Sequence, residues 1–273
     1  MIEKIAVFIL GGCIGSFLNV CIHRLPKDMS IVRPASFCPK CKAAVKWFDN
    51  IPLLSYFILS GKCRQCKGGI SLRYPSVEFI TACLFLFLYI NFSLTADFFK
   101  FAVFFSLLIV VSFIDIDYHA IPAYLCFIGI VAGLMFSLYD TAEVMAQGFS
   151  GRMPVFKAVK DLFISLGFAY FFKFSGDIFL AIYLALRKKD SIEGEKEALG
   201  LGDVDFMGVV GVFLGWPMAV LTFFIAPFIA IVYSIYAMLF KKTHLIPYLP
   251  YLSAAALVSF LWGKNILAYL GLI

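Results

Sequence analysis

Phe113-Ile114-Asp115-Ile116-Asp117 ends one long apolar run of the sequence, and Gly200-Leu201-Gly202-Asp203 begins another. A carboxylate at a membrane boundary is costly unless it has a task or a partner. Two such carboxylates, in segments far apart in the sequence, indicate a shared site. Their meaning depends on whether the surrounding runs cross a membrane and on which side they end.

The composition is typical of a membrane protein. Of the 273 residues, 62% are hydrophobic and 15% are charged, whereas soluble domains carry about 25% charged residues. The formal net charge of +6 is compatible with nucleic-acid binding. The basic residues cluster between the apolar runs, however, so we interpret them as a topology signal. We therefore predict an all-α polytopic membrane protein that binds no nucleic acid.

Eight apolar runs are candidates for membrane-spanning helices, since a span needs about 20 apolar residues. The weakest are the short sixth run and the fifth run, which Lys173 and Asp177 interrupt. We predict about eight spans, or seven if the short run does not cross alone. The first run lacks a cleavage site of small residues, so we expect a retained span. The runs are 4–22, 76–96, 100–117, 121–139, 162–186, 204–217, 218–240 and 249–271.

The loops that carry most Lys and Arg are expected on the cytoplasmic side. The segment 23–74 is rich in both residue types, and the loops 187–203 and 241–248 begin with basic residues. Alternation of the spans places all three loops on one side. The loop 140–161 is placed outside although it also carries basic residues, together with acidic ones. The result puts Asp115 and Asp203 at the same membrane depth on the cytoplasmic face.

Each predicted catalytic acid has a close acidic neighbour, Asp117 for Asp115 and Asp205 for Asp203. Residues two apart point about 200° away from each other on a helix, so only one of each pair easily faces a common point. Asp115 and Asp117 could be solvated charges at a helix end, and Asp203 could cap the next helix. The alternative is an aspartyl dyad. Two close carboxylates share a proton, and one then activates water while the other protonates a carbonyl.

Four of the eight cysteines form two CxxC pairs, separated by residues 42–62. This pattern predicts a tetrahedral, structural zinc site with Cys38, Cys41, Cys63 and Cys66 as ligands. A redox pair or an iron–sulfur cluster is the alternative, although disulfides are disfavoured in the cytoplasm. A segment with so few large apolar groups is marginally stable without a metal. Its apolar stretch 47–56 is either its core or a segment lying on the membrane, and we expect a mixture of both.

Several motifs, in order along nearly the whole chain, resemble those of the type IV prepilin peptidases. A single GxGD or CxxC would not be specific, but the set is. Besides the two CxxC pairs, the motifs are Gly15–Val20 with His23–Pro26, Asp49–Tyr56, Arg73–Pro75 with Glu78, Phe113–Asp117 with Ile121-Pro122, Gly200–Asp203, and Ile246–Tyr248 with Pro250-Tyr251.

This resemblance implies an intramembrane aspartyl protease of the GxGD type, in the bacterial inner membrane, with Asp115 and Asp203 as the catalytic residues. Such enzymes cut the basic leader from prepilins or type II secretion pseudopilins at the cytoplasmic face. Many also methylate the new N-terminal residue with S-adenosylmethionine. The sequence shows no Gly-rich nucleotide loop, so it assigns no residue to that cofactor. Glu78 could meet the basic leader, or be a carboxylate favoured near a helix start.

The resemblance also implies a division of the chain. We expect a first transmembrane helix at 1–22, a cytoplasmic zinc insert associated with methylation at 23–75, and a transmembrane peptidase domain at 76–273. The chain departs from the family pattern at Ala123, Asp205 and Leu249. Two other functions remain open, a transporter or proton relay that uses the same two aspartates and a zinc-stabilised membrane scaffold. A transporter would favour charges nearer mid-membrane and inverted repeats, and neither is apparent.

Overall fold

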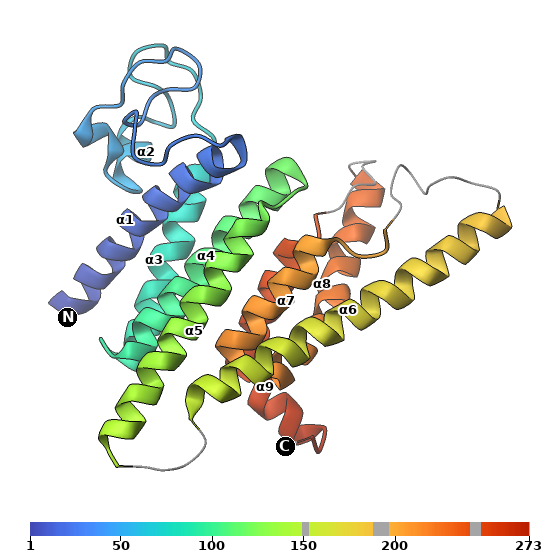
Figure 1. Cartoon of the computed structure of the whole chain (residues 1–273). Coiled ribbons are helices and arrows are strands. Elements are labelled where there is room, and N and C mark those ends of the chain that lie inside the picture. Colours follow the sequence, from blue (N-terminus) through green and yellow to red (C-terminus); the bar gives the residue numbers. More distant parts are fainter. Residues whose placement is uncertain (149–152, 188–196, 241–246, 273) are drawn as a thin grey trace. The chain divides into compact units, whose positions relative to one another are not determined.

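In the computed structural model, which describes residues 1–148, 153–187, 197–240 and 247–272, all regular elements are helices. These residues contain no strand, only two isolated β-bridges. Figure 1 labels the α-helices in chain order. The elements are α1 (Ile2–Arg24), η1 (Leu25–Lys27), η2 (Trp47–Asn50), α2 (Leu54–Ile58), α3 (Arg73–Phe92), α4 (Ala96–Tyr118), α5 (Ala123–Ala146), α6 (Pro154–Arg187), α7 (Leu201–Leu214), α8 (Trp216–Phe240) and α9 (Leu249–Tyr269).

The predicted all-α membrane fold is confirmed. Each of the eight apolar runs is a helix, and seven helices in the described part of the chain are long and apolar enough to cross a membrane. The exception is α7, which has 14 residues and is therefore about 21 Å long, less than the roughly 30 Å of a bilayer core. Length and composition alone therefore support seven of the eight predicted spans. The basic loop residues 188–189 and 241–242, and Arg152 and Ile246, lie outside the described residues.

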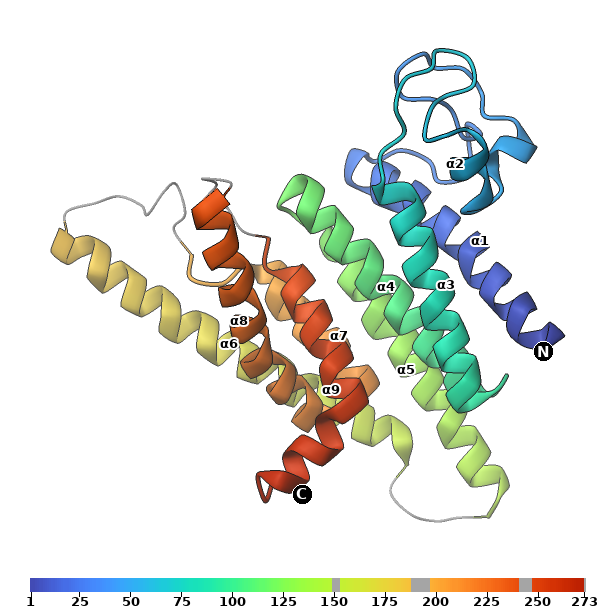
Figure 2. The ribbon, with the colours of Figure 1, turned by 180° about the vertical axis from the view of Figure 1, so that it is seen from behind.

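The chain divides into two compact units, and the first is Met1–Tyr118. It contains α1, α3, α4 and the insert, and α1 lies beside α3 in both views (Figure 1, Figure 2). Glycines make this pairing close: a Cβ on Gly11 would lie 2.8 Å from Ala82 Cα, and one on Gly15 would lie 2.7 Å from Glu78 Cα. The two helices therefore form a rigid base from which the insert projects.

The second unit is His119–Ile273, and α7 is its core. Residues 206–213 of α7 are all buried, and α5, α6 and α8 pack on this helix. A helix that is apolar all round is expected to be covered on every side. A Cβ on Gly208 or Gly211 would collide with α6, so small residues allow the close packing. The start of α7, which carries Asp203, is thus attached to a well-packed core.

Candidate functional site

Asp115 is the buried acid of α4. It is 8% exposed, in the last turn of the helix, while Ile114 beside it and Val111 one turn earlier are fully buried. Asp117 lies on the exposed side and forms an ion pair with Arg73 at the start of α3. The helix therefore separates the two carboxylates as their spacing predicts, with Asp115 in the packed interior of the unit and Asp117 at its surface.

Asp203 lies in the first turn of α7, half-buried, in the position where the helix dipole favours a negative charge. The residue that caps this helix is Gly200, so the alternative in which Asp203 is the cap is wrong. Gly200 leaves space for the acid, since a Cβ there would lie 3.3 Å from Asp203 Oδ2. Tyr248, the N-cap residue of α9, lies near this acid. Burial and then the charge of Asp203 raise the pKa of Tyr248 to about 12.

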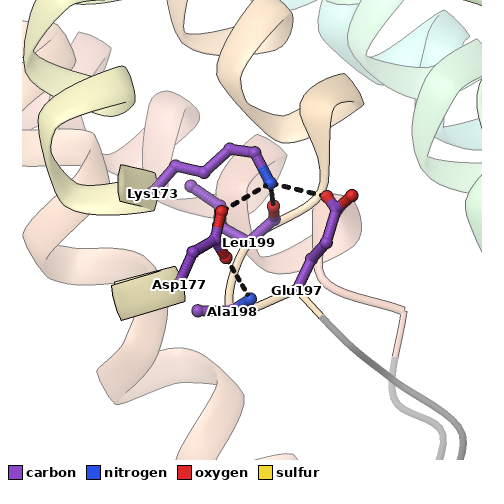
Figure 3. A network of polar contacts seen from close by, with 5 residues as sticks. All are labelled: Lys173, Asp177, Glu197, Ala198 and Leu199. Carbon is purple, nitrogen blue, oxygen red and sulfur yellow. Dashed lines mark hydrogen bonds and ion pairs between the residues drawn. The ribbon is translucent and has the colours of Figure 1, made fainter. Parts of the chain in front are cut away.

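A cluster of charged side chains fastens the segment before Gly200 to α6 (Figure 3). Lys173 is 8% exposed, and its Nζ donates to Glu197 Oε2 at 2.5 Å and to the Leu199 carbonyl at 2.8 Å. It also pairs with Asp177 Oδ2 at 3.2 Å. Asp177 Oδ1 accepts the backbone N–H of Ala198 at 2.7 Å. We call these residues, Lys173, Asp177 and 197–199, the Lys173 clamp.

The Lys173 clamp explains why two charges interrupt an apolar helix. Leu199 is followed directly by Gly200, so the clamp fixes the point at which the glycine loop begins. Gly176 adds to this attachment, because a Cβ there would lie 2.7 Å from the Cβ of Ala198. From the sequence, Lys173 and Asp177 were interpreted only as charges that make the fifth run a weaker candidate for a membrane span. Their spacing of four, which places both on one helix face, was the signal that could have indicated a pair.

The two predicted catalytic acids belong to different units. Asp115 lies in Met1–Tyr118 and Asp203 in His119–Ile273. The dyad therefore stays a prediction. What the structure adds is the local support of each acid, by packing for Asp115 and by the Lys173 clamp and Gly200 for Asp203.

The four cysteines of the two CxxC pairs are brought together. Their Sγ atoms all lie within 4.8 Å of one another, with 3.9 Å between Cys38 and Cys66 and 4.0 Å between Cys41 and Cys63. Tetrahedral zinc, with Zn–S of about 2.3 Å, sets neighbouring sulfurs roughly 3.8 Å apart. All four thiols are free of disulfides. The donor set therefore fits a structural zinc ion.

The two CxxC pairs lie in turns of the same form, 25 residues apart along the chain (Cys38 and Cys63). Cys38 N–H bonds Ala43 O and Cys63 N–H bonds Gly68 O, each at 2.9 Å. In both turns, backbone N–H groups point at the sulfur of the first cysteine. The Cys41 N–H lowers the pKa of Cys38 to about 6, and the Cys66 N–H lowers the pKa of Cys63. This favours a thiolate, the form that a metal requires, at the first cysteine of each pair.

The insert is fastened to the α1–α3 pair by Glu78. Its Oε2 accepts the backbone N–H of Leu53 at 2.7 Å. Leu53 has φ 63° and ψ −55°, a strained conformation closed by a 2.7 Å bond from Leu54 N–H to Pro52 O. Glu78 is thus a docking residue for the 49–56 motif, a role that neither sequence-based alternative included. A bidentate Arg64–Asp49 pair joins this motif to the second CxxC turn, and these hydrogen bonds lower the pKa of Asp49.

The apolar stretch of the insert is only partly a core. Ser55 is buried, but Trp47 is 81% exposed, Leu54 is 59% exposed and Phe57, just beyond the stretch, is 73% exposed. Exposed large apolar groups of this kind mark a surface that contacts a partner or a membrane. The expected mixture of core and surface-lying segment agrees with this exposure.

Comparison with known proteins gives consistent matches. A profile described as "Bacterial Peptidase A24 N-terminal domain" matches residues 9–92, and one described as "Type IV leader peptidase family" matches residues 102–235. Each of the following relatives is named "Prepilin leader peptidase/N-methyltransferase". The Klebsiella pneumoniae protein is 32% identical over 216 residues, which cover 77% of this chain and 84% of that protein.

The Bacillus subtilis relative is 29% identical over 266 residues and covers 96% of both chains. The Myxococcus xanthus relative is 34% identical over 210 residues, which cover 77% of this chain and 56% of that protein. A comparison with solved structures found no match.

Proposed function

The chain belongs to the type IV leader peptidase family, and from this premise we propose that it removes the leader peptide of prepilins or pseudopilins with Asp115 and Asp203 as an aspartyl dyad. The family's relatives are named as leader peptidases and N-methyltransferases. The observation that carries the proposal is the in-order match of both aspartate motifs within the matched region 102–235. The burial of Asp115 in a membrane-type helix supports it.

The chemistry follows from placing two carboxylates close together. Such a pair shares one proton because both cannot ionise cheaply. The ionised carboxylate takes a proton from water, which attacks the carbonyl of the scissile bond while the protonated carboxyl donates to its oxygen. Asp115, which is buried, would be the protonated member of the pair. Asp203, at a helix N-terminus, is suited to the ionised form.

The proposed substrate has a basic leader followed by an apolar helix. Its helix can enter the bilayer sideways while the leader stays in the cytoplasm, so that the scissile bond lies near the inner boundary. The basic segment 23–74 supports a cytoplasmic orientation for this end of the spans. We place the chain in the bacterial inner membrane, with residues 76–273 as the peptidase part.

We also propose that the chain methylates the new N-terminus of its product. S-adenosylmethionine would supply the methyl group, and the insert 23–75 would contribute to this activity. The zinc ion would be architectural, held by Cys38, Cys41, Cys63 and Cys66. It would close two turns that otherwise have little apolar core.

Mass spectrometry of a pilin-like precursor, incubated with the enzyme and S-adenosylmethionine, tests both activities at once. Asp115→Asn and Asp203→Asn should each abolish leader removal, whereas Asp97→Asn, at the other end of α4, should leave it unchanged. Cleavage retained in either of the first two variants would defeat the dyad. If both variants instead stop proton or cation flux in vesicles and the wild type cuts no precursor, the transporter alternative is correct.

A further inference from the structure

A cavity of about 530 Å³ lies in the first unit, between the insert and the adjoining ends of α1 and α3. Its volume is within the range of about 300–1,000 Å³ that is usual for small-molecule sites. One wall contains Cys38 and Cys63, so the proposed metal would hold that wall in place. No step of the proposed cleavage uses this cavity.

Two buried polar atoms in the cavity lining have no hydrogen-bond partner among the described residues. They are Oδ1 of Asn19, an acceptor, and Nε of Arg73, a donor. Asn19 is 3% exposed, and its Nδ2 already donates to Tyr74 O at 3.0 Å, so its orientation is fixed with the oxygen left over. Buried groups of this kind are almost always satisfied. Neither atom has accessible surface of its own, so a ligand with both a donor and an acceptor would satisfy the two by drawing these side chains toward the cavity.

The acids of the cavity lining differ in their availability. Asp49 is held by a bidentate pair with Arg64, whereas Glu78 accepts from neutral groups, the backbone N–H of Leu53 and the side chain of Ser16. Glu78 lies one helical turn from Tyr74, whose carbonyl accepts from Asn19 Nδ2, and both Asn19 and Glu78 line the cavity. Together they form an acceptor pair for a compact cation.

Other residues of the cavity lining offer groups that could bind a carboxylate and a planar base. Arg73, whose Nη1 is paired with Asp117, keeps Nε as a further donor for a carboxylate. Tyr56 and Tyr74 add aromatic rings that can contact a planar base. A ligand that combines a cation, a carboxylate and a base within one small molecule matches this arrangement.

We propose that this cavity binds S-adenosylmethionine, with Glu78 and Asn19 facing its sulfonium group and Arg73 facing its carboxylate. The proposal rests on the methylation part of the proposed function. It also gives Glu78 a second task, because the same side chain fixes the 49–56 motif that borders the cavity.

Direct binding to the full chain in lipid nanodiscs tests the proposal without an activity readout. Radiolabelled S-adenosylmethionine is compared with S-adenosylhomocysteine, which lacks the sulfonium charge. Glu78→Gln keeps an acceptor for Leu53 N–H but removes the negative charge. It should weaken S-adenosylmethionine binding by about tenfold or more and S-adenosylhomocysteine binding by less than about threefold. Glu3→Gln, at the opposite end of α1, should change neither.

Equal effects of Glu78→Gln on the two ligands, or no effect on either, would overturn the assignment of Glu78. A wild-type measurement avoids the folding of variants altogether. An azido-adenine analogue of S-adenosylmethionine, activated by light, should label peptides from residues 16–24 or 36–78. Labelling confined to other segments excludes the cavity.

The outcome can be separated from that of the protease proposal. Leader cleavage is measured on the same nanodisc samples. A wild type that cuts the precursor but binds neither ligand refutes the cavity site and leaves the dyad standing. A wild type that binds both ligands but cuts nothing refutes the dyad and leaves the cavity site standing.

Discussion

The two units support their predicted catalytic acids in opposite ways. Asp115 is in the last turn of a 23-residue helix, where apolar packing buries it. Asp203 is in the first turn of a 14-residue helix, after a glycine loop that charged groups of α6 fasten. Helix packing therefore positions one acid and a polar clamp positions the other. The first support is spread over many contacts, while the second depends on a few atoms and is easier to break.

The largest effect of a residue away from the two acids is expected from Lys173→Met. The change leaves Asp177 and Glu197 without their cation and the Leu199 carbonyl without a donor, in a partly buried place. Breaking such a network is strongly destabilising locally, so we expect leader cleavage to fall by about 100-fold. Steady-state cleavage of a pilin-like precursor measures this loss.

Lys157→Met, an exposed lysine of the same helix, is the matched control and should have almost no effect. Lys173→Arg should recover part of the activity, because the charge returns with a different geometry. Methylation of a pilin that has already been cleaved should be unchanged in Lys173→Met. Cleavage within about threefold of wild type would show that the clamp does not position the Gly200 loop.

The next effect concerns the first unit. Removal of the metal by a chelator, or the double change Cys63→Ser and Cys66→Ser, opens one wall of the insert cavity. Methylation should fall more than about tenfold, while leader cleavage changes by less than about threefold. Mass spectrometry of the product reports both activities. The single change Cys83→Ser, an exposed cysteine of α3 outside the metal cluster, is the control.

Equal loss of both activities after metal removal, with the helices intact by circular dichroism, would contradict this separation. It would mean that the insert supports the cleavage step directly. The sequence-based division, with methylation in 23–75 and cleavage in 76–273, would then need to be abandoned.

A smaller effect is expected from Gly200→Ala. The new Cβ would lie 3.3 Å from Asp203 Oδ2, so the carboxylate must shift by a few tenths of an ångström. We expect cleavage to fall by about fivefold to tenfold, mainly in kcat. Gly167→Ala is the control, because a Cβ at that position of α6 meets open space and Ala favours a helix over Gly. A Gly200→Ala variant as active as wild type would show that the acid tolerates displacement.

Hydropathy predicted most of the fold, because each apolar run long enough to cross a bilayer must satisfy its backbone as a helix. The run 204–217 was one of the two uncertain runs, since a short apolar run has the same pattern whether lipid or protein surrounds it. In the structure, α5, α6, α8 and α9, all of its own unit, pack on α7. The metal cluster was also predictable, because two CxxC pairs at this spacing are found in few arrangements other than a metal site.

Other features of the site depend on contacts between distant segments and could not be read from local patterns. Glu78 meets Leu53 across 25 residues and Lys173 meets Glu197 across 24. The local sequence around each of these residues does not indicate its distant partner. The cavity next to Asn19 also forms between distant segments. The unsatisfied amide oxygen of Asn19 can therefore be recognised only in the folded structure.

The smallest expected effect belongs to Asp117→Asn and sharpens the contrast within α4. Asp117 and Arg73 are 28% and 20% exposed in their side chains, so the ion pair is partly screened by solvent and worth about 0–1 kcal/mol. Thermal unfolding should shift by only a few degrees, the shift should shrink in high salt, and cleavage should stay within about twofold of wild type. Asp115→Asn, two residues away, changes the same chemical group and should abolish cleavage. If Asp117→Asn were equally damaging, the buried position of Asp115 would no longer distinguish it, and Asp117 would have to be considered as the acid of α4 that acts with Asp203.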